Sequence, residues 1–87
     1  MKERKKNIVV VIAAYNEEKK IKTVVDSVAK YVDLVVVVDD GSKDKTFEMV
    51  NNKKAVVLRH CINLGQGAAL QTGFEYVKKM SPKVVVT

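Results

Sequence analysis

The sequence predicts a single α/β domain in three layers, with helices on both faces of a parallel sheet. Three observations lead to this class. Runs of β-branched residues are not broken by polar residues, which is typical of strands buried on both faces. The segments between these runs place apolar residues at helical spacing. Strand and helix patterns alternate through all 87 residues without a long linker, an order that favours right-handed crossovers between parallel strands.

We expect about four strands and about three helices. The expected strands cover residues 8–13, 34–38, 55–58 and 83–87. The clearest helix follows the first strand, where Ile21, Val24, Val25, Val28 and Ala29 share one helical face. The last helix is expected to open at Gly65 and Gly67 and to end near residues 81–82, where a proline stands.

Polar residues mark the expected starts of the first two helices. Asn16 is the expected N-cap of the first helix, whose first turn would then hold Glu17 and Glu18. Ser42 or Asp44 is expected to cap the short second helix. Each of these side chains can accept a hydrogen bond from a backbone N–H that has no partner inside the helix.

Composition excludes several classes of protein. The hydrophobic fraction of 47% is that of a packed domain. The net charge of +6 comes with few aromatic residues, and none lies in a basic strand that could stack bases, so no nucleic-acid partner is expected. The single cysteine, Cys61, fits a reducing compartment. The longest apolar run, residues 8–15, is too short to span a bilayer, and a cytoplasmic location is expected.

Two adjacent aspartates, Asp39 and Asp40, follow the most apolar strand. Their charges repel, and burying either carboxylate costs free energy unless it has a partner. The loop at residues 13–17 follows the neighbouring strand, so both segments should meet at the carboxyl edge of the sheet, where ligands of parallel α/β folds bind. We therefore expect a crevice in which one carboxylate meets a ligand and the other secures the loop.

Familiar phosphate-binding and nucleophile motifs do not fit. Gly65 and Gly67 follow the third strand rather than the first, and Leu70 stands where a dinucleotide fingerprint needs glycine. A Walker A loop is absent from the sequence. His60 and Cys61 are neighbours whose side chains diverge in an extended chain, so a nucleophilic pair is not expected. Arg59 and Gln66 could approach a diphosphate, but we interpret them as solvated loop ends.

Three segments in order resemble the inverting family 2 glycosyltransferases of the GT-A fold, the group of the dolichyl-phosphate mannose and glucose synthases. They are Val11–Glu18, Val38–Thr46, and Asn63–Leu70 together with Gly73. The resemblance implies a Rossmann-like three-layer sheet, the N-terminal half of a GT-A nucleotide-binding domain. It also implies that residues 1–87 are a partial domain, an N-terminal fragment truncated before the family's Asp-x-Asp motif.

The resemblance assigns roles in nucleotide binding to five residues. Ala13, Tyr15 and Glu17 would lie against the nucleoside, with the Tyr15 ring on the base and Glu17 accepting hydrogen bonds from base or ribose. Asp40 would accept the hydrogen bond of the base's ring N–H, with Val38 close by. Family members often have proline where this chain has Ala13, which loosens the first loop.

Three further residues are expected to support the second loop. Asp39 would accept hydrogen bonds from nearby backbone, Gly41 would allow a tight turn, and Asp44 would help to begin the next helix. No catalytic residue and no metal ligand is expected among residues 1–87. In the parent enzyme, the resemblance implies Mg²⁺ or Mn²⁺ at the Asp-x-Asp motif, and no metal bound by this chain alone.

The implied function is the binding of a UDP- or GDP-sugar for transfer to a lipid phosphate or a glycan, in a parent that can meet a membrane through its acceptor. Two alternatives stay open: a nucleotide-binding module without chemistry, and an interaction protein that has kept the fold and lost the ligand. If the strand order follows the family, Val84–Val86 form an open sheet edge, and we expect a homo-oligomer through that edge.

Overall fold

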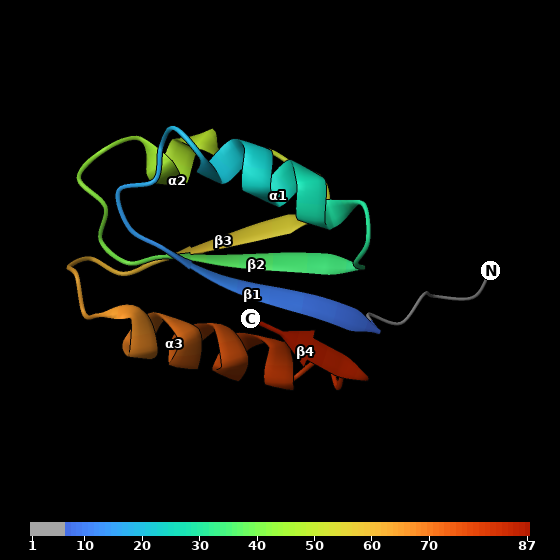
Figure 1. Cartoon of the computed structure of the whole chain (residues 1–87). Coiled ribbons are helices and arrows are strands. Elements are labelled where there is room, and N and C mark those ends of the chain that lie inside the picture. The colour runs from blue at the N-terminus through green and yellow to red at the C-terminus, as the bar shows by residue number, and fades with distance from the viewer. Residues whose placement is uncertain (1–6) are drawn as a thin grey trace.

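The computed structural model of the chain describes residues 7–87 and confirms the α/β class. Its strands are β1 (Ile8–Ala14), β2 (Leu34–Asp39), β3 (Ala55–Arg59) and β4 (Val84–Val86). Its helices are α1 (Ile21–Ala29), α2 (Thr46–Met49) and α3 (Gln66–Lys78). The strands are all parallel and follow the order β3-β2-β1-β4. Helices α1 and α2 cover one face of the sheet and α3 covers the other (Figure 1).

The core consists of two apolar layers, one on each face of the sheet. Side chains alternate between the faces along a strand, so Val36 and Val38 of β2 pack on the α3 side while Val35 and Val37 pack on the α1 side. All residues of β2 are buried as a result. This double burial explains why the strand shows no polar alternation in the sequence.

The first helix begins later than the sequence predicts. Helix α1 starts at Ile21 without a side-chain cap, so the prediction that Asn16 caps it is wrong, and Glu17 and Glu18 lie before its first turn. Asn16 has a φ of 53°, which places it in a turn. The N–H groups of Glu17 and Glu18 are satisfied instead by the side chains of Thr46, the first residue of α2, and Asp44, in the loop before α2. Contacts between distant loops have replaced the local cap.

Neither of the two alternative caps predicted for α2 is its N-cap, which is Lys45 and forms no side-chain cap hydrogen bond. Asp44 Oδ1 accepts the N–H of Thr46, the first residue of α2, at 2.9 Å. Ser42 does not cap the helix, because its Oγ accepts the N–H of Asn16 at 2.8 Å. The last helix ends at Lys78, before the proline. None of the helices in residues 7–87 is long and apolar enough to cross a membrane.

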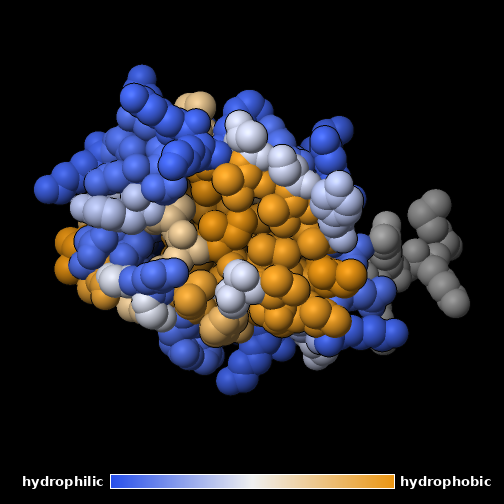
Figure 2. Space-filling view, in the orientation of Figure 1, coloured by the Kyte–Doolittle hydropathy of each residue, from blue (hydrophilic) through white to orange (hydrophobic). Residues whose placement is uncertain are grey.

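Strand β4 forms an edge of the described sheet, as the expected strand order requires. It pairs with β1 on one side, and Val84, Val85 and Val86 are 48%, 40% and 45% exposed. Figure 2 shows a continuous hydrophobic surface over this part of the molecule. An edge strand without charged side chains is open to pairing with another strand.

We propose that two copies of the chain associate through β4, because pairing would satisfy the open backbone groups and cover the valines. Burying a valine side chain contributes roughly 1.5–3 kcal/mol when burial is complete. Val85→Lys is therefore expected to lower the average mass, measured by light scattering over a concentration series. Tyr31→Lys adds the same charge at a site that is 80% exposed and should leave the mass unchanged. A wild-type chain that is monomeric throughout the series would contradict the proposal.

Candidate functional site

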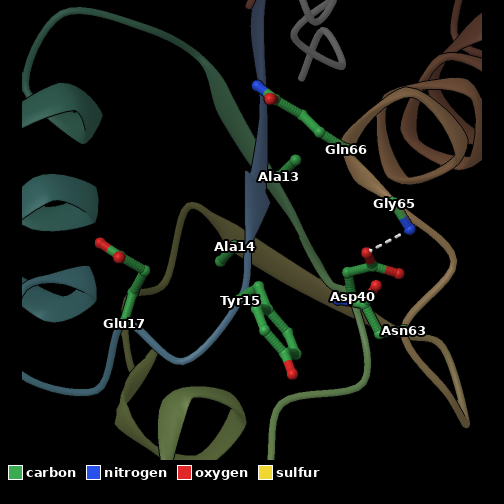
Figure 3. A pocket seen from close by; sticks show the side chains of 8 residues that line it. All are labelled: Ala13, Ala14, Tyr15, Glu17, Asp40, Asn63, Gly65 and Gln66. Atoms are coloured by element: carbon green, nitrogen blue, oxygen red, sulfur yellow. Dashed lines mark hydrogen bonds between the residues drawn. The ribbon is translucent and has the colours of Figure 1, made fainter.

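A cavity of about 430 Å³ opens at the carboxyl ends of β1 and β2, beside the start of α3. Its lining residues are Ala13, Ala14, Tyr15, Glu17, Asp40, Asn63, Gly65 and Gln66 (Figure 3). The cavity thus lies where ligands of parallel α/β sheets bind. Its volume is within the range of small-molecule sites.

The loop after β1 supplies one wall of the cavity. Tyr15 is 42% exposed, and in Figure 3 its ring lies between Glu17 on one side and Asp40 on the other. Asn16 holds this loop to the loop after β2, because its N–H donates to Ser42 Oγ and its Oδ1 accepts the Lys43 N–H at 2.9 Å. The aromatic face and the Glu17 carboxylate are therefore presented to solvent from an anchored turn.

Asp40 forms the opposite wall and is only 3% exposed. Its Oδ1 accepts the Leu64 N–H at 2.9 Å and lies 2.8 Å from His60 Nδ1. Its Oδ2 accepts the Gly65 N–H at 2.8 Å. Burial raises the pKa of Asp40, but the hydrogen bonds from Leu64, His60 and Gly65 outweigh it and hold that pKa below 3.8. Asp40 is therefore ionised at neutral pH.

The ionised Asp40 carboxylate keeps one acceptor position open. A carboxylate has about four lone-pair positions, two on each oxygen. On Oδ1 both are taken, by Leu64 and His60, whereas Oδ2 has one partner, Gly65, among residues 7–87. Asp40 lines the cavity, so Oδ2 can accept one further hydrogen bond from a ligand that carries an N–H or O–H donor.

Asp39 lies outside the cavity and is fully buried. Its Oδ1 accepts the Ser42 N–H at 3.1 Å. Its Oδ2 lies 3.5 Å from Arg59 Nε and has no hydrogen bond within the described residues, so that pairing is electrostatic only. The Arg59 guanidinium in turn lies 4.8 Å from the centre of the Phe47 ring. Arg59 thus packs beside the second loop instead of extending freely into solvent.

Asp44 and Thr46 join the two loops that frame the cavity. Asp44 accepts hydrogen bonds from the Glu18 N–H and from both the N–H and the hydroxyl of Thr46. Thr46 Oγ1 accepts the Glu17 N–H at 2.8 Å. Burial raises the pKa of Asp44, but the hydrogen bonds from Thr46 and Glu18 lower it by more, so the net shift is downward from 3.8.

Acidification is expected to destabilise the chain through Asp40 and Asp44. Each pKa is lowered by folding, so each carboxylate contributes stability that is complete above its unfolded pKa and is lost as pH falls through its folded pKa. We expect the free energy of unfolding to change little between about pH 7 and about pH 5 and to fall below about pH 4.

Urea unfolding over a pH series measures this effect. Asp44→Asn should lower stability at neutral pH and make the acid fall shallower, because one carboxylate that must be protonated is gone. Glu75→Gln, at an exposed position of α3, is the matched control and should follow the wild-type curve. Parallel curves for Asp44→Asn and the wild type would contradict the role given to Asp44.

The structure brings four of the five predicted nucleotide-binding residues to the cavity: Ala13, Tyr15, Glu17 and Asp40. The Val38 side chain is not among them. It is fully buried on the α3 face, where it packs against Gly73. The Val38 side chain points into the core and does not line the cavity.

Asn63, Gly65 and Gln66 line the cavity, although sequence reasoning gave them no firm place in the site. In the sequence they were indicated only by Asn63–Leu70, the third segment that resembles the family. Gln66 is exposed but belongs to the cavity wall, so its interpretation as a solvated loop end is incomplete. His60 had no sequence signal, and its contact with Asp40 arises only from folding.

The residues of the site do not form a metal centre. Within residues 7–87, no three His, Cys, Asp or Glu side chains are grouped so that they could hold a metal ion. Asp40 already directs its oxygens at backbone N–H groups and His60. The Mg²⁺ or Mn²⁺ implied by the family resemblance therefore does not fit these residues.

Comparison with known proteins gives one family. The family model described as Glycosyl transferase family 2 matches residues 9–85. The protein MJ1222 of Methanocaldococcus jannaschii is 42% identical over 85 residues, which are 95% of this chain and 35% of that protein. The UDP-N-acetylglucosamine–dolichyl-phosphate N-acetylglucosaminyltransferase of Methanococcus voltae is 34% identical over 100 residues, covering 94% of this chain and 40% of that protein.

A solved structure gives the same result. The glucosyl-3-phosphoglycerate synthase of M. tuberculosis superposes with a TM-score of 0.69 at 30% identity, and the match covers 82% of this chain and 30% of that one. The chain thus spans 35% and 40% of the length of the two curated relatives named above.

Proposed function

We propose, from the fact that the chain belongs to glycosyl transferase family 2, that it binds the nucleotide of a sugar donor, a UDP- or GDP-sugar. One observation carries the proposal. Asp40 is ionised, nearly buried and hydrogen-bonded at three of its acceptor positions, and it lines the cavity, so its fourth acceptor position is open to a ligand there. Uracil and guanine both carry a ring N–H that can donate to such an acceptor.

The other lining residues suit a nucleoside. The Tyr15 ring is exposed on the cavity wall, and aromatic rings stack on bases with a gain of about 1–3 kcal/mol per base. Glu17 lies in the same wall and can accept hydrogen bonds from ribose hydroxyls. Base and ribose would then lie between the loop after β1 and Asp40.

The cavity offers few favourable contacts to the diphosphate of a nucleotide. Among the described lining residues there is no lysine, arginine or histidine, while Glu17 and Asp40 are acidic. A diphosphate near these carboxylates is repelled. We therefore propose that the nucleoside supplies most of the affinity, that binding by this chain is weak, and that it does not depend on Mg²⁺ or Mn²⁺.

Sugar transfer is proposed for the whole protein, with inversion at the sugar and with a lipid phosphate or a glycan as acceptor. The dolichyl-phosphate transferase of M. voltae supports the lipid phosphate. We propose that transfer needs groups beyond residues 7–87, because the relatives are more than twice as long as the matched part. A cytoplasmic location belongs to the same proposal, since the free Cys61 is exposed and suits a reducing compartment.

Titration of the purified chain tests the nucleotide proposal. Uridine, UDP, guanosine and GDP are each added with and without Mn²⁺, and binding is followed by calorimetry or by amide NMR shifts. One base should bind, with the nucleoside and its diphosphate close in affinity and Mn²⁺ without effect. Tyr15→Ala should weaken that binding about tenfold, whereas Tyr31→Ala should not. Absence of binding, or binding that requires Mn²⁺, would contradict the proposal.

A further inference from the structure

His60 links the Asp40 carboxylate to helix α3. The side chain follows β3, is 11% exposed, and has a partner at each ring nitrogen. Nδ1 lies 2.8 Å from Asp40 Oδ1, and Nε2 lies 2.8 Å from Thr72 Oγ1 in α3. The backbone N–H of His60 also donates to the carbonyl of Asp39 at 2.9 Å. The ring is therefore held at both nitrogens and the backbone by a third hydrogen bond, and the residue does not line the cavity.

The partners of His60 determine which nitrogen carries the proton. An ionised carboxylate accepts hydrogen bonds and cannot donate them, so Nδ1 must carry a proton that it donates to Asp40. In the neutral imidazole the other nitrogen is then an acceptor. The Thr72 hydroxyl can donate to Nε2, which satisfies both nitrogens with a single tautomer. The contacts thus select the Nδ1–H form.

We propose that His60 is a positioning residue that sets the direction of the Asp40 carboxylate. By filling the second acceptor position of Oδ1, His60 leaves Oδ2 as the oxygen of Asp40 with an open acceptor position, on a residue that lines the cavity. Without this bond, Oδ1 also has an open position and the carboxylate is held by the two loop N–H groups alone. The consequence for nucleotide affinity rests on the proposed function, whereas the orientation of Asp40 does not.

The imidazole nitrogens report the proposed arrangement directly. The chain contains one histidine, so its ¹⁵N signals need no assignment among several rings. At about pH 8.5, where an ordinary imidazole is neutral, the free wild-type chain should show a protonated Nδ1 and an unprotonated Nε2. Thr72→Val removes the hydroxyl partner of Nε2 but should keep the Nδ1–H form, because the Asp40 carboxylate still accepts from Nδ1. An Nε2–H tautomer, or a wild-type mixture, would overturn the proposal.

Two substitutions separate positioning from packing. The amide of asparagine can keep a donor near the place of Nδ1, so His60→Asn should leave the Leu64 and Gly65 amide proton shifts close to those of the wild type. His60→Ala should move both, because the carboxylate that they bind is released. Cys61→Ala changes an exposed neighbour and is the control. Equal shifts for His60→Ala and the control would also overturn the proposal.

Affinity gives the third comparison. For the nucleotide that binds, His60→Ala should weaken binding about tenfold, and His60→Asn should stay within about twofold of the wild type. If His60→Ala keeps wild-type affinity and loses only stability, His60 is a packing residue. If the wild type binds no nucleotide, the proposed function fails, and the tautomer and the two amide shifts still decide the orientation of Asp40.

Discussion

Replacing Asp40 with asparagine is expected to reduce nucleotide affinity by about tenfold to a hundredfold and to lower the free energy of unfolding by about 2 kcal/mol. Leu64, Gly65 and His60 all direct hydrogen bonds at the carboxylate, so an amide nitrogen must face at least one of them. The least conflict arises when this nitrogen replaces Oδ2, where it meets one N–H instead of two. The side chain at position 40 then offers a ligand in the cavity a hydrogen-bond donor instead of an acceptor.

Asp39→Asn is the matched control, one residue away and with the same change of chemistry. Asp39 Oδ1 has one backbone donor, Ser42, and Oδ2 has only the electrostatic contact with Arg59. An amide nitrogen in place of Oδ2 meets no backbone N–H, so the loss of stability should stay below about 1 kcal/mol and affinity should not change. Calorimetric titration and urea unfolding of both variants make the comparison. A larger loss of affinity in Asp39→Asn would reverse the two roles.

Replacing Gly41 with alanine is expected to cost about 3–5 kcal/mol of stability and to remove nucleotide binding. Gly41 has a φ of +72°, which L-residues rarely adopt, and a Cβ there would lie 2.4 Å from the backbone carbon of Ile62 and 2.6 Å from the nitrogen of Asn63. Backbone atoms cannot rotate away as a side chain can. The segment from Ile62 to Gly65 must therefore move, and with it the N–H groups that bind Asp40.

The same substitution at Gly67 is not expected to lower the stability of the chain. A Cβ at Gly67 meets no atom within 4 Å, and the residue lies in the first turn of α3. Alanine should be neutral or should stabilise the helix by up to about 1 kcal/mol. Urea unfolding and the amide spectrum of Leu64 and Gly65 follow both variants. A Gly41→Ala chain that keeps wild-type stability and amide shifts would show that the loop contact is not needed.

The fold could be predicted because its signal lies within each segment. The β-branched runs became strands. Of the residues predicted on one face of the first helix, Ile21, Val25 and Ala29 are buried, whereas Val24 is 42% exposed, contrary to the prediction. The family resemblance read from three segments is confirmed by the match over residues 9–85. The ends of the elements were predicted less well. Asn16 does not cap α1 as predicted, because it forms hydrogen bonds with the loop after β2.

Only those site residues that directly follow the end of a strand could be predicted. Tyr15, Glu17 and Asp40 follow β1 and β2, so the geometry of a parallel sheet brings them together. The orientation of Val38 follows from the face on which β2 packs against α3. The contacts of Asp40 with His60, Leu64 and Gly65 connect residues more than 19 positions apart, and no spacing in the sequence announces them.

The central claim is that Asp40 accepts a hydrogen bond from the ring N–H of a base. The most direct measurement compares the affinity of wild-type and Asp40→Asn chains for the nucleoside that binds and for its ring N-methyl analogue, 3-methyluridine or 1-methylguanosine. Methylation should weaken binding to the wild type at least about tenfold and should weaken the residual binding to Asp40→Asn far less, because the contact is already lost. Equal losses in both chains, or wild-type binding that tolerates the methyl group, would contradict the claim.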